Sequence, residues 1–145
     1  MIEYRLARAT DAPELKALTD LFSDCECNAV EAVEQSLRDN VQEIVCVAAE
    51  EDRLVGFCCG QIAKSMCYSV HNGEIYELFI LPEYRRHGIA KHLIELAESE
   101  LRARGVESFR LMTGRDNHAA QSLYRACGYV QTSEMLFAKR PARRS

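Results

Sequence analysis

The chain of 145 residues lacks the features that would assign it to a membrane, secreted or repeat protein. No stretch approaches the ~20 consecutive apolar residues of a membrane-spanning helix. The segment MIEYRLARATDAPEL contains acidic residues and no apolar run, so we do not expect a signal peptide. No linker, repeat or low-complexity tract is present. We therefore expect one cytoplasmic domain over residues 1–145, no membrane partner, and a flexible basic tail at residues 140–145.

Positive charge is also scarce in this sequence. The 18 lysines and arginines are outnumbered by 22 aspartates and glutamates, which gives a net charge of −4. Domains that bind nucleic acid usually carry a basic surface, so nucleic acid is not an expected partner. A hydrophobic content of 48% and a charged content of 28% are those of an ordinary globular protein.

The seven cysteines do not form the spacing of a metal site. Cys25 and Cys27 make a C-x-C pair, but no second C-x-x-C or H-x-x-x-H accompanies it, so we expect no metal. An odd number of cysteines without a secretion signal indicates free thiols in a reducing compartment. Cys46, Cys58 and Cys59 lie in apolar runs and are expected to pack in the core.

Apolar periodicity predicts an α/β domain whose mixed central sheet is flanked by helices. The predicted order is β-α-α-β-β-β-α-β-α-β-β. Asp11 with Glu14, and Asn28 with Glu31, fit the capping box that begins a helix. The strands are expected at 2–9, 43–49, 54–64, 74–81, 108–114 and 129–139, and the helices at 12–22, 29–39, 88–104 and 116–127.

The stretch LPEYRRHGIAKHLI, residues 81–94, places basic side chains directly before a helix. The first turn of a helix has backbone N–H groups without acceptors, and the helix dipole makes that end positive. An anion would be bound there, and Gly88 would let it approach the backbone. A basic surface loop before a helix is the alternative. Neither G-x-x-x-x-G-K-[ST] nor G-x-G-x-x-G is present, so no standard nucleotide motif applies.

Two motifs together resemble the GCN5-related N-acetyltransferase (GNAT) family. RRHGIA, residues 85–90, resembles its [QR]-x-x-G-x-[GA] signature, and NHAAQSLYRACGY, residues 117–129, resembles its N-x-x-A-x-x-L-Y-x-x-x-G-[FY] segment. The resemblance implies the GNAT fold and acetyl-CoA as cosubstrate. The residues that it implies in binding acetyl-CoA are Phe79, Ile80 and Leu81 beside pantetheine, Arg85, Arg86, His87, Gly88, Ile89, Ala90 and Lys91 around the pyrophosphate, and Asn117.

The same resemblance implies the chemistry. Tyr124 would be the acid at the departing sulfur, and the backbone amide of Leu78 or Ile80 would polarise the thioester carbonyl. Glu74 and Glu77 are alternative bases, and a water relay is a third. Because Glu74 and Glu77 lie three residues apart on a predicted strand, their side chains are expected on opposite faces of the sheet.

The acceptor is expected to be a primary amine of a small molecule. Acidic residues in the region of the first two helices would favour a cationic amine, and a solvated helix face is the alternative explanation. They are Asp20, Asp24, Glu26, Glu31 and Glu34. Met112 occupies the position where ribosomal-protein alanine acetyltransferases have a glutamate, which argues against that substrate.

Other acceptors and roles stay open. The hairpin stretch SMCYSVHNG could contribute Tyr68 and His71 to the acceptor site. The layout of this hairpin resembles that of aminoglycoside 6′-N-acetyltransferases. A protein or peptide amine, a non-catalytic acyl-CoA sensor of the same fold, and a homodimer are further alternatives.

Overall fold

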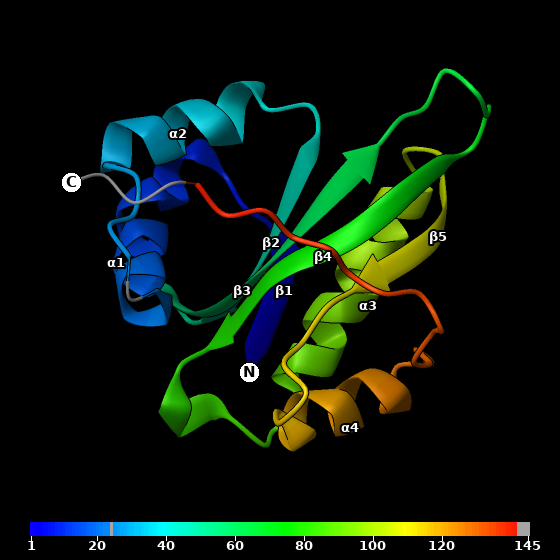
Figure 1. The fold of residues 1–145 in the computed structure, drawn as a ribbon. Helices are drawn as coiled ribbons and strands as arrows, with labels where there is room; N and C mark the ends of the chain where they lie inside the picture. The colour runs from blue at the N-terminus through cyan, green and yellow to red at the C-terminus, as the bar shows by residue number, and fades with distance from the viewer. Residues whose placement is uncertain (24, 142–145) are drawn as a thin grey trace.

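Five strands form one sheet in the order β1-β2-β3-β4-β5 in the computed structural model, which describes residues 1–23 and 25–141 (Figure 1). They are β1 (Ile2–Leu6), β2 (Glu43–Glu50), β3 (Arg53–Ala63), β4 (His71–Ile80) and β5 (Val106–Leu111). Neighbouring strands are antiparallel except β4 and β5, which are parallel. A parallel pair requires a crossover, which the chain makes through a helix. The predicted mixed sheet is confirmed.

Helices lie on both sides of the sheet. Figure 1 shows α1 (Ala12–Phe22) and α2 (Val30–Asp39) on one side, and α3 (Ile89–Arg102) with α4 (His118–Ala126) on the other. Two short 3₁₀ turns, η1 (Ala9–Asp11) and η2 (Pro82–Tyr84), precede α1 and follow β4. No helix of the described residues combines the length and apolarity needed to cross a membrane.

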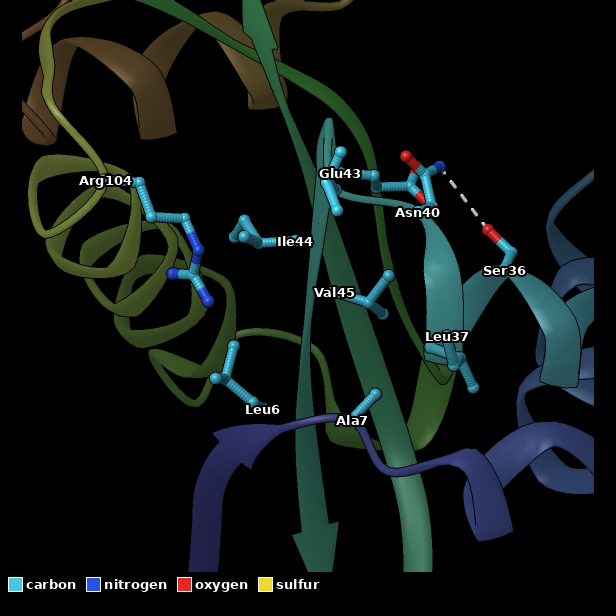
Figure 2. Close-up of a pocket in the computed structure, with 10 residues that line it drawn as sticks. Leu6, Ala7, Ser36, Leu37, Asn40, Glu43, Ile44, Val45 and Arg104 are labelled. Atoms are coloured by element: carbon cyan, nitrogen blue, oxygen red, sulfur yellow. Dashed lines mark hydrogen bonds between the residues drawn. The ribbon is translucent and has the colours of Figure 1, made fainter.

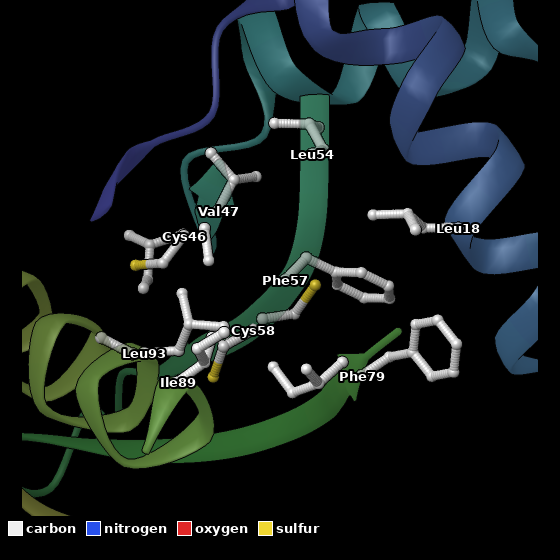
Figure 3. Close-up of a cluster of buried hydrophobic side chains, with 14 of the residues drawn as sticks. Leu18, Cys46, Val47, Leu54, Phe57, Cys58, Phe79, Ile89 and Leu93 are labelled. Carbon is white, nitrogen blue, oxygen red and sulfur yellow. The ribbon is translucent and has the colours of Figure 1, made fainter. Parts of the chain in front are cut away.

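The core is divided between the two faces of the sheet, as Figure 3 shows. Leu18, Phe57 and Phe79 pack on the α1 side, whereas Ile89 and Leu93 pack on the α3 side. The predicted packing role of the thiols fits their burial, because Cys46 and Cys58 have no exposed surface and Cys59 is 9% exposed. A strand buried on both faces must be apolar at nearly every position, which explains the sequence of β3.

Within the segment where β3 and β4 pair, β4 has one residue more than β3. Cys59 faces Glu77, and the next residue of β3, Gly60, faces Ile75, so Tyr76 bulges out of the pairing and is 58% exposed. A bulge shifts the side-chain alternation by one residue. The prediction that Glu74 and Glu77 lie on opposite faces is therefore wrong: Glu74 faces Gln61 and Glu77 faces Cys59, on the same face.

Strands β4 and β5 separate at this bulge. Their pairing runs from His71 with Val106 to Ile75 with Leu111, and beyond it the register of β4 continues with β3 alone. The amide of Leu81 donates to Val55 O at 2.9 Å, toward β3. Backbone groups of an antiparallel strand alternate in direction, so the N–H groups of Leu78 and Ile80 face the side that β5 has left.

The final predicted strands, residues 129–139, are wrong. The described residues after α4 contain no strand, and Met135, Leu136 and Phe137 are 74%, 73% and 85% exposed. Alternating residues become a strand only when an edge pairs with them, and no register of the sheet includes this segment. It crosses the sheet in front of β4 in Figure 1. The expected basic tail lies outside the described residues from position 142 onward.

Asp11 is the N-cap of α1, as predicted, but neither predicted capping box forms. The Asp11 side chain binds Arg5 and the amide of Arg8 instead, and Glu14 Oε2 accepts from the amide of Leu54 at 2.9 Å. Ala29, not Asn28, is the N-cap of α2. Glu14 thus binds a residue far away in the sequence, which local spacing does not reveal.

Candidate active site

The N-terminus of α3 has the geometry of an anion site. Gly88 is its N-cap with φ 79° and ψ 6°, and Arg86 also has a positive φ of 66°. The hydrogen bonds of the helix begin with the amide of His92 donating to Gly88 O at 3.2 Å. The amides of Ile89, Ala90 and Lys91 therefore lie ahead of the helical ladder. A Cβ at Gly88 would meet only His92 Nδ1, at 4.0 Å, so the space before the helix is open.

The basic side chains of this loop differ in their contacts. Arg85 Nε donates to Ile80 O at 2.9 Å, and its guanidinium lies 5.6 Å from the centre of the Phe79 ring. This contact ties the loop to the open side of β4. Arg86 and His87 are exposed. Ile89 is 3% exposed, so it can offer a backbone amide to an anion while its side chain packs in the core.

Tyr124 lies half-buried on α4. Its ring stands edge-on to that of Tyr129, with centroids 6.5 Å apart. Burial raises the pKa of the Tyr124 hydroxyl, and the Cys58 and Cys127 thiols add to this effect. Because the pKa is raised above 10, the hydroxyl carries its proton at neutral pH and can donate it.

Two other polar side chains fix α4. Asn117 is its N-cap, and Asn117 Oδ1 accepts from the amide of Ala120 at 3.1 Å. The Tyr129 hydroxyl donates to Glu98 Oε2 at 2.6 Å and so connects the end of α4 to α3. The motif included Tyr129 without giving it a role, and no sequence signal indicated Glu98.

The two carboxylates proposed as bases differ in their partners. Glu74 Oε1 forms an ion pair with Arg110 Nε of β5, at 2.8 Å. Glu77 Oε2 is buried and has no hydrogen-bond partner among the described residues. Burial raises the pKa of Glu77, and the charge of Glu43 raises it further.

Glu43 was not predicted to lie at this site. It extends from β2, and one ligand atom each from Glu43, Cys59 and Glu77 lie within 4.8 Å of one another. Figure 2 shows Glu43 and Val45 on the α2 side of β2, opposite Ile44 and Arg104. The expectation of no metal stays a prediction. Only the pairing of β2, β3 and β4 reveals this group.

Two cavities lie near these carboxylates. The cavity in Figure 2, of about 320 Å³, sits at the edge of β2 beyond the end of β1 and includes Glu43 in its wall. The other, of about 670 Å³, is bounded by Gln61, Glu74 and Arg110 among others. Neither includes a residue of the α3 N-terminus or of α4.

The acidic segment is partly neutralised by neighbouring bases. Lys16 Nζ binds Asp20 Oδ1 at 2.8 Å and Arg38 Nη2 binds Glu34 Oε1 at 2.6 Å. Glu26 and Glu31 are exposed. Asp24 lies outside the described residues.

The two hairpin residues expected near the acceptor lie in the β3–β4 connection and at the start of β4. Tyr68 is 70% exposed in the β3–β4 connection, and His71 begins β4, where its amide donates to Gly105 O at 3.2 Å.

Comparisons with known proteins identify the family of this chain. The family model "Acetyltransferase (GNAT) family" matches residues 14–129. The acetyltransferase SG1711 of Sodalis glossinidius is 39% identical over 90 residues, which are 60% of this chain and 63% of that protein. The acetyltransferase ECA0875 of Pectobacterium atrosepticum is 28% identical over 143 residues, or 96% and 95% of the two chains. The match to SG1711 thus spans less than two thirds of that relative's length.

Solved structures share the fold. An aminoglycoside acetyltransferase from a soil metagenome, in complex with trehalose, superimposes with a TM-score of 0.85 at 19% identity, over 98% of this chain and 97% of that one. A complex of AAC(6′)-Iy with the bisubstrate analogue CoA-S-monomethyl-acetylneamine gives 0.84 at 21% identity, over 98% and 99%. Since the family model covers most of the chain, the chain belongs to the GNAT acetyltransferase family.

Proposed function

We propose that this chain is an acetyl-CoA-dependent N-acetyltransferase that acts on a primary amine of a small, cationic acceptor. The observation that carries the proposal is the separation of β4 from β5 at the Tyr76 bulge. It leaves the N–H groups of Leu78 and Ile80 facing an open side of the sheet. An extended pantetheine chain can hydrogen-bond there as an added strand would.

The donor's diphosphate would bind at the N-terminus of α3. The free amides of Ile89, Ala90 and Lys91 and the positive end of the helix dipole suit an anion. Arg86 and His87 would add charge, whereas Arg85 would chiefly hold the loop against Ile80 O. Asn117 would contribute to the site indirectly: it caps α4 and so fixes where that helix begins.

In the reaction, the neutral amine nitrogen forms a bond with the thioester carbonyl carbon, and the carbon–sulfur bond breaks. The nitrogen loses one proton to a base, and the departing sulfur gains one from the Tyr124 hydroxyl. The amide of Leu78 or Ile80 would stabilise the negative oxygen that forms in the transition state. The raised pKa of Tyr124 keeps its proton available until the sulfur leaves.

Glu77 suits the role of base better than Glu74. Glu74 is held by Arg110 at 2.8 Å, whereas Glu77 Oε2 is buried without a partner among the described residues. Glu77 also lies on the part of β4 that has already left β5. A raised pKa makes Glu77 a stronger proton acceptor once it is ionised.

The proposal is tested by incubating the protein with acetyl-CoA and four classes of amine: a polyamine, an arylalkylamine, an aminoglycoside and a peptide with a free N-terminus. Products are identified by mass spectrometry. Acetylation of at least one small amine is expected. Acetylation of the peptide alone would overturn the small-molecule assignment. Calorimetric binding of acetyl-CoA without turnover of any amine would make the chain a sensor.

The base is tested with Glu77→Gln and Glu74→Gln, which preserve side-chain size. We expect kcat to fall by roughly 10²–10⁴ in Glu77→Gln, as for loss of a general base. Glu74→Gln should retain most of the kcat of wild type. Nearly unchanged rates in both variants would assign proton removal to a water relay.

A further inference from the structure

Glu43 is a half-buried carboxylate with no role in the reaction as described so far. It lies at the start of β2, two strands away from Glu77 in the order of the sheet. Glu43 faces Gln61 across β2 and β3, and Glu77 faces Cys59 across β3 and β4. Because Cys59 and Gln61 are two residues apart on β3, all four side chains lie on one face. A carboxylate oxygen of Glu43 lies within 4.8 Å of one of Glu77.

The two carboxylates have unequal hydrogen bonding. Burial raises the pKa of Glu43, and the hydrogen bond that Gln61 Nε2 donates to Glu43 Oε2 at 2.8 Å opposes this rise by favouring the ionised form. Glu77 Oε2 is buried and receives no such bond from the described residues. Two carboxylates this close in a poorly solvated place resist being charged together. The first proton that the pair takes up as pH falls therefore resides mainly on Glu77, which lacks such a bond.

Other ionisable groups near Glu77 leave this assignment unchanged. Burial raises the pKa of the Cys59 thiol well above 9, so the thiol is neutral at working pH. Arg110 is bonded to Glu74. The groups that interact with Glu77 or adjoin it are Glu43 on β2, Cys58 and Cys59 on β3, Glu74 and Tyr76 on β4, and Arg110 on β5.

We propose that Glu43 and Glu77 form a carboxyl pair in which Glu43 is the positioning residue: ionised and held by Gln61, it sets the protonation of the base Glu77 and attracts the acceptor's ammonium group. This inference rests on the proposed function, because it assigns Glu77 as the base. Above the pKa of Glu77 both carboxylates are ionised, and the ammonium group that reaches the pair donates its proton to Glu77 and becomes the neutral amine that attacks the thioester. Glu43 keeps its negative charge throughout and so stabilises the protonated pair.

The test compares the pH profiles of kcat/KM and kcat for wild type and Glu43→Gln, on one acceptor and in the presence of EDTA. The amide oxygen of the new side chain can still accept from Gln61, so packing is retained. Removing the neighbouring charge lets Glu77 ionise at lower pH. The acid limb of the profile should therefore move to lower pH, and KM for a cationic acceptor should rise while KM for acetyl-CoA stays the same. The acceptor amine titrates identically in the two assays. A difference between the two pH profiles therefore reports the ionisation of a group of the protein.

Two variants serve as controls. Glu107→Gln removes an equal charge from an exposed position on β5 and should leave the acid limb in place. Glu43→Asp keeps the charge and should return the limb toward that of wild type. An unmoved limb in Glu43→Gln, or an equal shift in Glu107→Gln, overturns the proposal.

A second measurement needs no turnover. The carboxyl carbon of Glu77 can be titrated by ¹³C NMR, with its signal assigned by comparison with Glu77→Gln. The pKa of Glu77 should fall in Glu43→Gln, and an unchanged pKa overturns the pair. If wild type acetylates no amine, the proposed function fails, but this titration still decides whether the two carboxyls are coupled.

Discussion

Arg5 binds Asp11 through both carboxylate oxygens. Nη1 lies 2.7 Å from Oδ2, and Nη2 lies 3.0 Å from Oδ1. The amide of Arg8 also donates to Oδ2, at 2.7 Å. Arg5 is on β1 and Asp11 precedes α1, so this largely buried pair fastens the first helix to the sheet.

Breaking the pair should destabilise the protein. We expect Asp11→Asn to lower the free energy of unfolding by about 2–4 kcal/mol, since it leaves Arg5 poorly compensated in a mostly buried place. Urea denaturation at pH 7 measures this. Asp20→Asn removes an exposed ion pair with Lys16 and is the matched control, with little loss expected. Equal losses in the two variants would contradict the prediction.

The same pair predicts how stability depends on pH. The hydrogen bonds from Arg5 lower the pKa of Asp11 below 3.8. A carboxylate whose pKa is lowered by folding stabilises the native state above its unfolded pKa and loses that contribution as pH falls through the folded value. The stability difference between wild type and Asp11→Asn should therefore be full at neutral pH and shrink below pH 3.8. A difference that is constant down to pH 2 would refute this account.

Removal of the Tyr124 hydroxyl should slow the reaction without loosening donor binding. In Tyr124→Phe we expect kcat to fall by roughly 10²–10³, as for loss of a general acid, while KM for acetyl-CoA changes little. Burial raises the pKa of Tyr124, so any loss of rate from its ionisation should occur above pH 10. Tyr129→Phe, which loses the hydrogen bond to Glu98, is the control: its free energy of unfolding should fall while its kcat stays close to that of wild type. Full kcat in Tyr124→Phe would indicate that solvent, and not Tyr124, protonates the departing sulfur.

Gly88 should be required for donor binding more than for folding. Its φ of 79° makes any other residue strained, by about 1 kcal/mol, but an added Cβ would point into open space. Gly88→Glu places a carboxylate where the diphosphate would bind, so calorimetry should detect no acetyl-CoA binding in a protein that still folds. Gly105→Ala is the control. Gly105 has a φ of 90° and follows the C-terminal end of α3, so this substitution should also strain the backbone but leave the affinity for acetyl-CoA unchanged. Unchanged affinity in Gly88→Glu would place the donor elsewhere.

The buried thiols should be structural and unreactive. Cys46→Ala should lower stability by roughly 1–2 kcal/mol, as small core truncations do, with turnover nearly unchanged. Burial raises the pKa of Cys46 to about 12, so it carries almost no thiolate at pH 8. In the native protein, a disulfide reagent should react with the exposed Cys25 and Cys67 first, and with Cys46, Cys58 and Cys59 only after denaturation. Rapid native modification of Cys46 would contradict this.

The sequence predicted the parts of the fold that depend on local pattern. The periodicity of 89–102 and the glycine before it specify α3, because helix geometry and a left-handed N-cap are local properties. The continuous apolar run of β3 likewise indicates a strand covered on both faces. The last predicted strands were wrong, because residues 129–139 have the alternation of a strand but no edge of the described sheet pairs with them.

The site was predictable only where a motif is contiguous. Gly88 and Tyr124 belong to such motifs, and resemblance was enough to single them out. Glu43 and Cys59 reach Glu77 through the register of three strands, which no spacing along the chain encodes. The faces of Glu74 and Glu77 depend on the one-residue bulge, since period-two reasoning holds only for an uninterrupted strand.

The bulge at Tyr76 also limits how this chain can change in length. Inserting one residue there, beside the one-residue bulge, would shift the pairing with β3 by one and move every preceding side chain of β4 to the other face. Ile75, now 5% exposed, would leave its place in the core, and Glu74 would turn toward α3. An insertion in the exposed connection 64–70 has no such effect, because no pairing depends on it. Length variation should thus be tolerated in that connection and excluded within β4, although the two lie only a few residues apart.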